Sequence, residues 1–470
     1  MRVPGGRLIR LQLAAGTVLL ATRLLPRWFR RPARSEGDLS PLAPLPTIPG
    51  KSPTAPPLLH AAFGALDAAA VRWSLVRGDT QDIAGGARDI DLLVAEADWP
   101  RVAHCLAGLG FLRVPTYGRG STGFYVGHDR EAASWVRLDL ATDLAWGGFS
   151  QFQSRAGGGC LDRSIRFDGL PSLDLDDAFW ALVLHCVLAK GAVVQRHAAR
   201  LQHLVESARE DGPMGSLVAS LLPRGWSPET VRNVVRAGEW TRLLGLQRRM
   251  FLTLWQRDPL GTTARTIGRA VQRGLGYFRL ARRRWGLSVA LLGPDGAGKT
   301  TLAAAIAADF GLPVRIVYMG LWAMRDHRGI GRIPGFLVVA RPFTIWRKSI
   351  VAEYHRAHGR LVIFDRYTYD ALGPPRGRLL FLKRPYFWFL AHAAPAPTLD
   401  FLLDAPGELL FARSGEANAA KLERAGAAFR SLASRIPGLQ VIDARQSPEA
   451  IRAQVVERIW GEYLAQGAVD

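Results

Sequence analysis

The residues best suited to chemistry form one glycine-rich run. Residues 293–300 read Gly-Pro-Asp-Gly-Ala-Gly-Lys-Thr and fit the pattern GxxxxGK[ST]. In this pattern the glycines let backbone N–H groups close around phosphate oxygens, the lysine reaches the terminal phosphates, and the hydroxyl ligates magnesium. The chain has only six lysines, so Lys299 at this position is informative. We therefore expect a binding loop for ATP and Mg²⁺. The expected nucleotide contacts are Gly293, Asp295, Gly296, Ala297, Gly298, Lys299, Thr300 and Thr301.

A second set of reactive side chains follows another apolar run. Leu361–Phe364 leads directly into Asp365 and Arg366. A carboxylate at the end of a parallel strand can hold magnesium together with Thr300, and an adjacent arginine can bind an acceptor phosphate with two hydrogen bonds. The alternative for Asp365 and Arg366 is a salt bridge at the strand end.

Further cations follow the next strand-like run. Arg413, Lys421 and Arg424 could cover the site and place positive charge on a transferring phosphoryl group, or they could be solvated helix charges. The expected catalytic residues are Lys299, Asp365, Arg366 and Arg413.

Three acidic residues form a separate candidate site in the N-terminal half. Asp89 and Asp91 are two residues apart, so on a strand they face the same side, and Asp139 lies in another apolar strand-like run. Three carboxylates on two strands can bind the divalent metals used in nucleotidyl transfer. The alternative to a metal is Arg137. It falls on the same strand face as Asp139 and could neutralise the carboxylates of a cluster that binds no metal.

Alternating strand-like and helix-like segments surround these residues and predict an α/β protein. The C-terminal strands are expected at Ser288–Leu292, Val314–Tyr318, Leu361–Phe364, Leu399–Leu403 and Leu439–Ile442, with a helix at Lys299–Phe310. This alternation is typical of a parallel sheet flanked by helices. The N-terminal half is expected to be α+β. Its strands are expected at Trp73–Val76, Ile90–Val94 and Trp135–Leu140, and its helices at Leu58–Val71, Asp98–Leu109 and Leu175–Glu206.

Four segments follow from composition and charge. Residues 1–57 are a basic tail and proline-rich linker, residues 58–215 the first domain, residues 216–286 a basic helical connector, and residues 287–470 the domain with the glycine-rich run. The net charge of +21 is concentrated in the tail, where residues 1–34 hold eight arginines and no acid, and in the connector. The chain is therefore not uniformly basic, which makes nucleic acid an unlikely partner without excluding it.

The tail and the cysteines bear on localisation. The apolar stretch Leu11–Thr22 is shorter than the ~20 residues that a spanning helix needs, and its arginine flanks leave an interfacial helix, a signal-like segment or an over-extended gene start open. Cys105, Cys160 and Cys186 have no ligand-like or disulfide-like spacing. We therefore expect a cytoplasmic protein, with peripheral membrane contact through the tail and a homodimer both left open.

Four motifs in order carry a resemblance over residues 287–465. GPDGAGKTT, the strand-end DRY, LDFLLDAP and VIDA resemble thymidylate kinases, and look most like the thymidylate kinase-like proteins of bacterial polysaccharide gene clusters. The resemblance implies that Asp295 faces the acceptor sugar hydroxyl and Arg366 the acceptor phosphate. The run Val317–Trp322 lacks the acidic-proline signature of true thymidylate kinases, and the lid is poor in arginine, so the acceptor could be another phosphorylated molecule.

The N-terminal acids carry a second, weaker resemblance over residues 58–206. A glycine turn at Gly78, the Asp89-x-Asp91 pair and a later strand with Asp139 resemble the nucleotidyltransferase fold. The usual Gly-Ser pair is replaced here by Arg77-Gly78-Asp79, which leaves a folded but inactive domain open.

The sequence thus predicts ATP-dependent phosphoryl transfer to a nucleoside monophosphate or a related phosphorylated acceptor. Two alternatives stand beside this hypothesis. One is an ATP-binding regulatory or assembly protein of a polysaccharide machine, attached to a membrane through the arginine-rich tail. The other is a nucleic-acid end-processing protein whose basic connector holds phosphates.

Overall fold

The computed structural model describes residues 55–77, 89–115, 117, 122–283, 285–320, 336–372, 380–415, 418–433 and 435–467. Expectations for the arginine-rich tail, the proline-rich linker before residue 55, Gly78 and Leu321–Trp322 lie outside these residues. All described residues belong to one compact unit, Pro53–Asp470.

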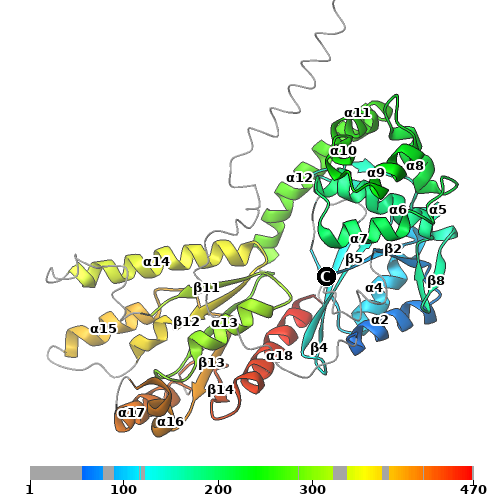
Figure 1. Ribbon diagram of the computed structural model, residues 1–470. Helices are drawn as coiled ribbons and strands as arrows, with labels where there is room; N and C mark the ends of the chain where they lie inside the picture. Colours follow the sequence, from blue (N-terminus) through cyan, green and yellow to red (C-terminus); the bar gives the residue numbers. More distant parts are fainter. Residues whose placement is uncertain are drawn as a thin grey trace, which may run out of the picture. The chain divides into compact units, whose positions relative to one another are not determined.

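The N-terminal half contains a mixed seven-stranded sheet with the order β3-β4-β5-β2-β1-β9-β8 (Figure 1). Strand β5 shows why this segment forms a strand, because Val136, Leu138 and Leu140 alternate inward against the helices α2 (Pro57–Ala68) and α4 (Trp99–Gly108). The strands of the sheet are β1 (Trp73–Arg77), β2 (Asp89–Val94), β3 (Leu112–Val114), β4 (Thr122–Asp129), β5 (Ser134–Ala141), β8 (Ile165–Phe167) and β9 (Leu170–Ser172). The three expected strands and the first two expected helices are confirmed, and the α+β expectation with them.

One expected helix is interrupted. The predicted span Leu175–Glu206 forms α6 (Leu175–Leu184), a π-helical turn (His185–Lys190) and α7 (Gln195–Leu204), so the expectation of one continuous helix is wrong. Gly191, with φ of +64°, ends the π-helical turn in the left-handed conformation that glycine adopts without steric cost.

The connector is helical, as the sequence predicts. Its side chains pack with those of α6 and α7 in one hydrophobic core, which includes Phe179, Leu201, Val218, Val235 and Leu254. The helices that follow α7 are α8 (Pro213–Leu221), α9 (Pro228–Arg236), α10 (Trp240–Leu244), α11 (Gln247–Arg257) and α12 (Pro259–Arg283).

The C-terminal half is built on a five-stranded sheet with the order β11-β12-β10-β13-β14, in which every pairing is parallel. One face of the sheet packs against α13 and α18, and Ala352 of α14 packs on the other face (Figure 1). The parallel α/β architecture is therefore confirmed. The strands are β10 (Ser288–Leu292), β11 (Val314–Tyr318), β12 (Leu361–Asp365), β13 (Leu399–Asp404) and β14 (Gln440–Asp443). The helices are α13 (Lys299–Asp309), α14 (Phe336–Ala357), α15 (Leu380–Ala391), α16 (Gly407–Ser414), α17 (Ala419–Arg430) and α18 (Pro448–Gly467), with a 3₁₀ turn, η5 (Thr368–Leu372).

Neighbouring strands place the candidate residues at one edge of this sheet. Leu291 near the end of β10 pairs with Asp365 at the end of β12. In open parallel sheets, ligands bind outside the carboxyl ends of strands where the strand order reverses. Among the described helices, none combines the length and apolar character needed to cross a membrane.

Candidate functional site

The glycine-rich run forms the loop between β10 and α13. Gly293, Gly296 and Gly298 have φ angles of 137°, 83° and 87°, which side chains disfavour. A Cβ atom at Gly296 would lie 2.5 Å from the carbonyl oxygen of Leu410, so the close approach of α16 also requires glycine. Ala297, within the loop, is buried, and Thr301 is exposed on α13. The loop therefore has the backbone freedom that wrapping a phosphate requires.

Lys299 begins α13 and lies under this loop. Its side chain is 5% exposed, and Nζ donates hydrogen bonds to the carbonyl oxygens of Gly293 at 2.9 Å and Pro294 at 2.6 Å. Burial, followed by the nearby charge of Arg366, lowers the pKa of Lys299 to about 8. The ammonium group is thus held at the loop by two neutral acceptors, which an anionic phosphate could replace.

Thr300 and Asp365 are brought into direct contact. Thr300 Oγ1 donates a hydrogen bond to Asp365 Oδ2 at 2.7 Å. Asp365 is 5% exposed, and its Oδ1 is buried without a hydrogen-bond partner. A buried carboxylate oxygen without a partner is costly, and carboxylate and hydroxyl oxygens are the donors that Mg²⁺ prefers. The residues present therefore fit a magnesium ion.

Arg366 and Asp295 also meet at this edge. Arg366 has φ of +66°, an uncommon conformation for a residue with a side chain, and its Nη2 donates a hydrogen bond to Asp295 Oδ1. Burial disfavours the guanidinium charge, but Asp295 and Asp370 outweigh burial and raise the pKa of Arg366. Asp295 is 48% exposed, so this ion pair faces the open side of the loop.

Asp370 is a site residue that sequence reasoning missed. It lies in η5, its side chain is 6% exposed, and Oδ2 lies 4.0 Å from Arg366 Nη1 without a hydrogen-bond partner. Burial raises its pKa to about 6, although Arg366 and Lys299 oppose the rise. The available signal was an acid four residues beyond Arg366, in the segment that follows a predicted strand.

Arg413 is directed elsewhere in this structure. Its Nη1 donates a hydrogen bond to the carbonyl oxygen of Ala444 at 2.8 Å. Arg424 donates to the carbonyl oxygen of Ala420 in its own helix, and Lys421 is exposed. The covering role of these cations stays a prediction.

The N-terminal acids lie side by side on parallel strands. Asp91 of β2 pairs in register with Asp139 of β5, and Asp89 pairs with Arg137. Arg137 donates hydrogen bonds to the carbonyl oxygens of Gly311 and Phe310. Among the described side chains, which do not include that of Asp89, no group of three or more His, Cys, Asp and Glu residues could hold a metal ion.

A cavity lies near the ends of the two strands that carry these acids. A cavity of about 290 Å³ is lined by Glu96, which follows β2, and by Thr142 and Asp143, which follow β5. The remaining lining residues are Gln153, Arg155, Gly157 and Gly158, so neither Asp91 nor Asp139 faces it.

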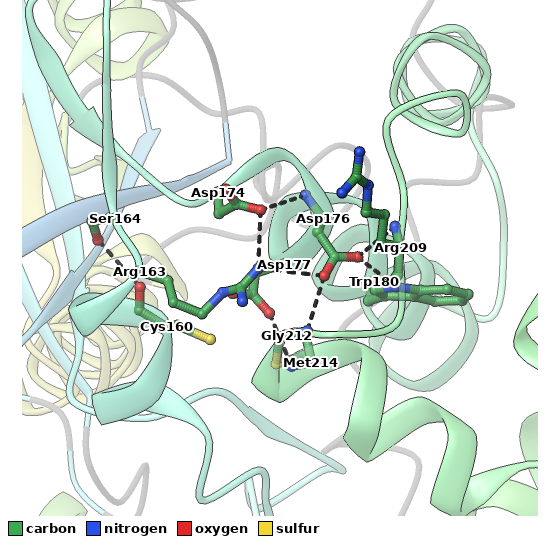
Figure 2. Close-up of polar contacts among 10 residues, drawn as sticks. All are labelled: Cys160, Arg163, Ser164, Asp174, Asp176, Asp177, Trp180, Arg209, Gly212 and Met214. Atoms are coloured by element: carbon green, nitrogen blue, oxygen red, sulfur yellow. Dashed lines mark hydrogen bonds and ion pairs between the residues drawn. The ribbon is translucent and has the colours of Figure 1, made fainter.

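The most deeply buried acids of the N-terminal half have a structural role that the sequence did not reveal. Asp176 accepts hydrogen bonds from the backbone N–H of Arg209 and Gly212 and from Trp180 Nε1 (Figure 2). Asp177 accepts one from the Met214 N–H, and its Oδ2 lies 3.3 Å from Arg163 Nε. These contacts fasten the start of α6 to the turn before α8.

Comparisons with known proteins give a structural likeness but no family. No protein-family model matches the chain, and no curated protein matches it. Among solved structures, the chain is similar to the deoxyadenosine kinase from M. mycoides with bound dATP, with 12% identity, a TM-score of 0.28, and coverage of 37% of this chain and 98% of that one. A likeness this low assigns no function, so a functional assignment must rest on the geometry of the site.

Proposed function

We propose that the C-terminal half is a kinase that transfers the γ-phosphoryl group of ATP to a small-molecule acceptor. The observation that carries the proposal is the buried Lys299 ammonium at the glycine-rich loop, beside the Thr300–Asp365 contact at the ends of adjacent strands. A buried cation, a loop of backbone donors and an oxygen ligand pair are the parts that phosphoryl transfer requires.

Each part has a distinct role in this proposal. Loop N–H groups bind the β- and γ-phosphates, and Lys299 stabilises the charge that develops between them. Thr300 and Asp365 would hold Mg²⁺, which neutralises phosphate charge when bound. Asp295 and Arg366 orient the acceptor on the open side of the loop. The sequence resemblance to thymidylate kinase-like proteins agrees with these roles.

The decisive experiment replaces the buried ammonium. Lys299→Ala should reduce ATP-dependent phosphoryl transfer by a factor of ~10³ or more, because nothing else in the loop supplies a fixed cation. Lys190→Ala, at an exposed lysine of the N-terminal half, is the matched control and should retain turnover. A panel of nucleosides, sugars and their monophosphates with ATP and Mg²⁺ provides the assay, and circular dichroism checks the fold. Wild-type turnover in Lys299→Ala would eliminate the kinase proposal.

A second candidate function belongs to the N-terminal half. The register pairing of Asp91 with Asp139 favours a metal-dependent nucleotidyltransferase-like site that includes Asp89. Calorimetric titration of the full chain with Mn²⁺ should detect a site that disappears in Asp139→Asn and persists in Asp211→Asn, at an exposed acid. Identical titrations of wild type and Asp139→Asn would argue against this candidate.

A further inference from the structure

Among the described residues of the site, two carboxylates lie beside Arg366 on the acceptor side. Asp295 pairs with Nη2 of Arg366, and Asp370 Oδ2 lies 4.0 Å from Nη1. Together these three side chains carry a formal charge of about −1 when all are ionised. The positive charge of Arg366 is therefore already neutralised by a carboxylate beside each of its Nη atoms before an acceptor binds.

This arrangement disfavours a phosphorylated acceptor. A phosphate monoester is a dianion that accepts hydrogen bonds and has none to donate near neutral pH. To reach Arg366 it must displace Asp295, which occupies the exposed edge of the guanidinium, and it would still face the buried charge of Asp370. Bound ATP adds further negative charge nearby, which increases the repulsion.

A hydroxyl suits the same residues. A hydroxyl donates one hydrogen bond and accepts others, so it can donate to a carboxylate and accept from a guanidinium at once. Asp295, which is 48% exposed, presents an acceptor on the open side, and Arg366 beside it presents donors. Binding a neutral hydroxyl requires neither ion pair to break.

We propose that the acceptor is an uncharged, hydroxyl-bearing small molecule, of the sugar or nucleoside class, whose reacting hydroxyl binds between Asp295 and Arg366. This inference rests on the proposed kinase function of the site, and it replaces the phosphorylated acceptor that the sequence predicts. Asp370 acts through Arg366 as a positioning residue, because its buried carboxylate holds the guanidinium and opposes the entry of an anion.

The proposed step balances with these groups. The hydroxyl oxygen forms a bond to the γ-phosphorus of ATP, and the bond from that phosphorus to the β–γ bridging oxygen breaks. ADP leaves with the bonding electron pair, and the hydroxyl proton passes to the carboxylate of Asp295.

The test compares matched acceptors with the full chain, ATP and Mg²⁺. Thymidine is paired with thymidine 5′-phosphate, and ribose with ribose 5-phosphate. Wild type should prefer the uncharged member of a pair in kcat/KM by a factor of ~100 or more. Asp370→Asn should reduce that preference by ~10-fold or more, because one of two repelling charges is lost. Asp400→Asn removes another buried acid with an unpartnered oxygen, and it should leave the preference unchanged.

A binding measurement needs no knowledge of the natural acceptor. With Mg·ADP saturating, Asp295→Asn and Asp370→Asn should each bind inorganic phosphate at least ~10-fold more tightly than wild type. Preference of the wild type for the monophosphate members, or unchanged phosphate affinity in both variants, would overturn the inference while leaving the kinase intact. Failure of Mg·ATP to bind, or full turnover in Lys299→Ala, would instead defeat the underlying kinase proposal.

Discussion

Asp176 and Asp177 in the N-terminal half and Asp365 and Asp370 in the C-terminal half are all almost fully buried, but their oxygens have different partners. The first pair accepts backbone and tryptophan N–H groups and faces Arg163 (Figure 2). Asp365 and Asp370 each keep one buried oxygen without a hydrogen bond. Asp177 Oδ2 also lacks one, but it lies 3.3 Å from Arg163 Nε. Burying a carboxylate is costly in both places, but the first pair accepts more hydrogen bonds and lies closer to a guanidinium, so more of its cost is offset within the fold. We therefore expect the first pair to stabilise the fold and the second pair to act on a bound ligand.

The largest expected effect comes from an uncompensated acid. Asp365→Asn should reduce phosphoryl transfer by about 10³-fold, equivalent to about 4 kcal/mol, because the amide cannot replace the charge of a magnesium ligand. The melting temperature should not fall, since the amide oxygen can still accept the Thr300 hydroxyl hydrogen bond. Steady-state kinetics and thermal unfolding of the same preparation check both parts. A large loss of stability would place Asp365 with the structural acids.

For Asp177 we expect the opposite result, a loss of stability without a loss of turnover. Asp177→Ala should lower the free energy of unfolding by about 3 kcal/mol, because it leaves the buried Met214 N–H without an acceptor and removes one of the three carboxylates that face Arg163. Thermal unfolding measures this loss, and Asp211→Ala, at an exposed acid in the same region, is the control. Kinase turnover well below the transition should match wild type. Loss of turnover with an unchanged melting temperature would contradict the structural role.

The two pairs also differ in how far the sequence could predict them. Lys299, Thr300 and Asp365 were identifiable because a short run fixes the loop and a strand end fixes the acid, so local spacing determines most of their geometry. Asp370 was missed because its place in the site is defined by the nearby charges of Arg366 and Lys299, the second of which lies far away in the sequence. The backbone hydrogen bonds to Asp176 and Asp177 join residues 33 to 37 positions apart, and no local pattern encodes them.

Secondary structure shows the same limit. All five C-terminal strands were predicted to within about a residue, because each is a short apolar run bounded by turn residues. The interruption between α6 and α7 was not predicted, because apolar residues continue past the end of α6 while the backbone changes hydrogen-bonding pattern. Gly191 was the one visible signal of that break.

The smallest expected effect concerns Asp400, a buried acid of the central strands with one oxygen that lacks a hydrogen-bond partner. Asp400 on β13 is 7% exposed, its Oδ1 has no hydrogen-bond partner, and burial raises its pKa to about 7. It faces Tyr367 and Tyr369, which add no positive charge. Since the unfolded carboxyl ionises near pH 4, the folded protein should lose stability as the pH rises from about 4 to about 7.

Asp400→Asn should remove this pH dependence. The variant should exceed wild type in the free energy of unfolding by about 2 kcal/mol at pH 8 and match it below about pH 3, where the carboxyl is mostly neutral in both the folded and the unfolded state. Chemical unfolding at the two pH values provides the measurement. Asp443→Asn is the control of opposite sign, because the hydrogen bond from Arg445 lowers the pKa of the exposed Asp443 to about 2. If Asp400→Asn instead destabilises the chain equally at both pH values, then the carboxylate has a stabilising partner and belongs with Asp176 and Asp177.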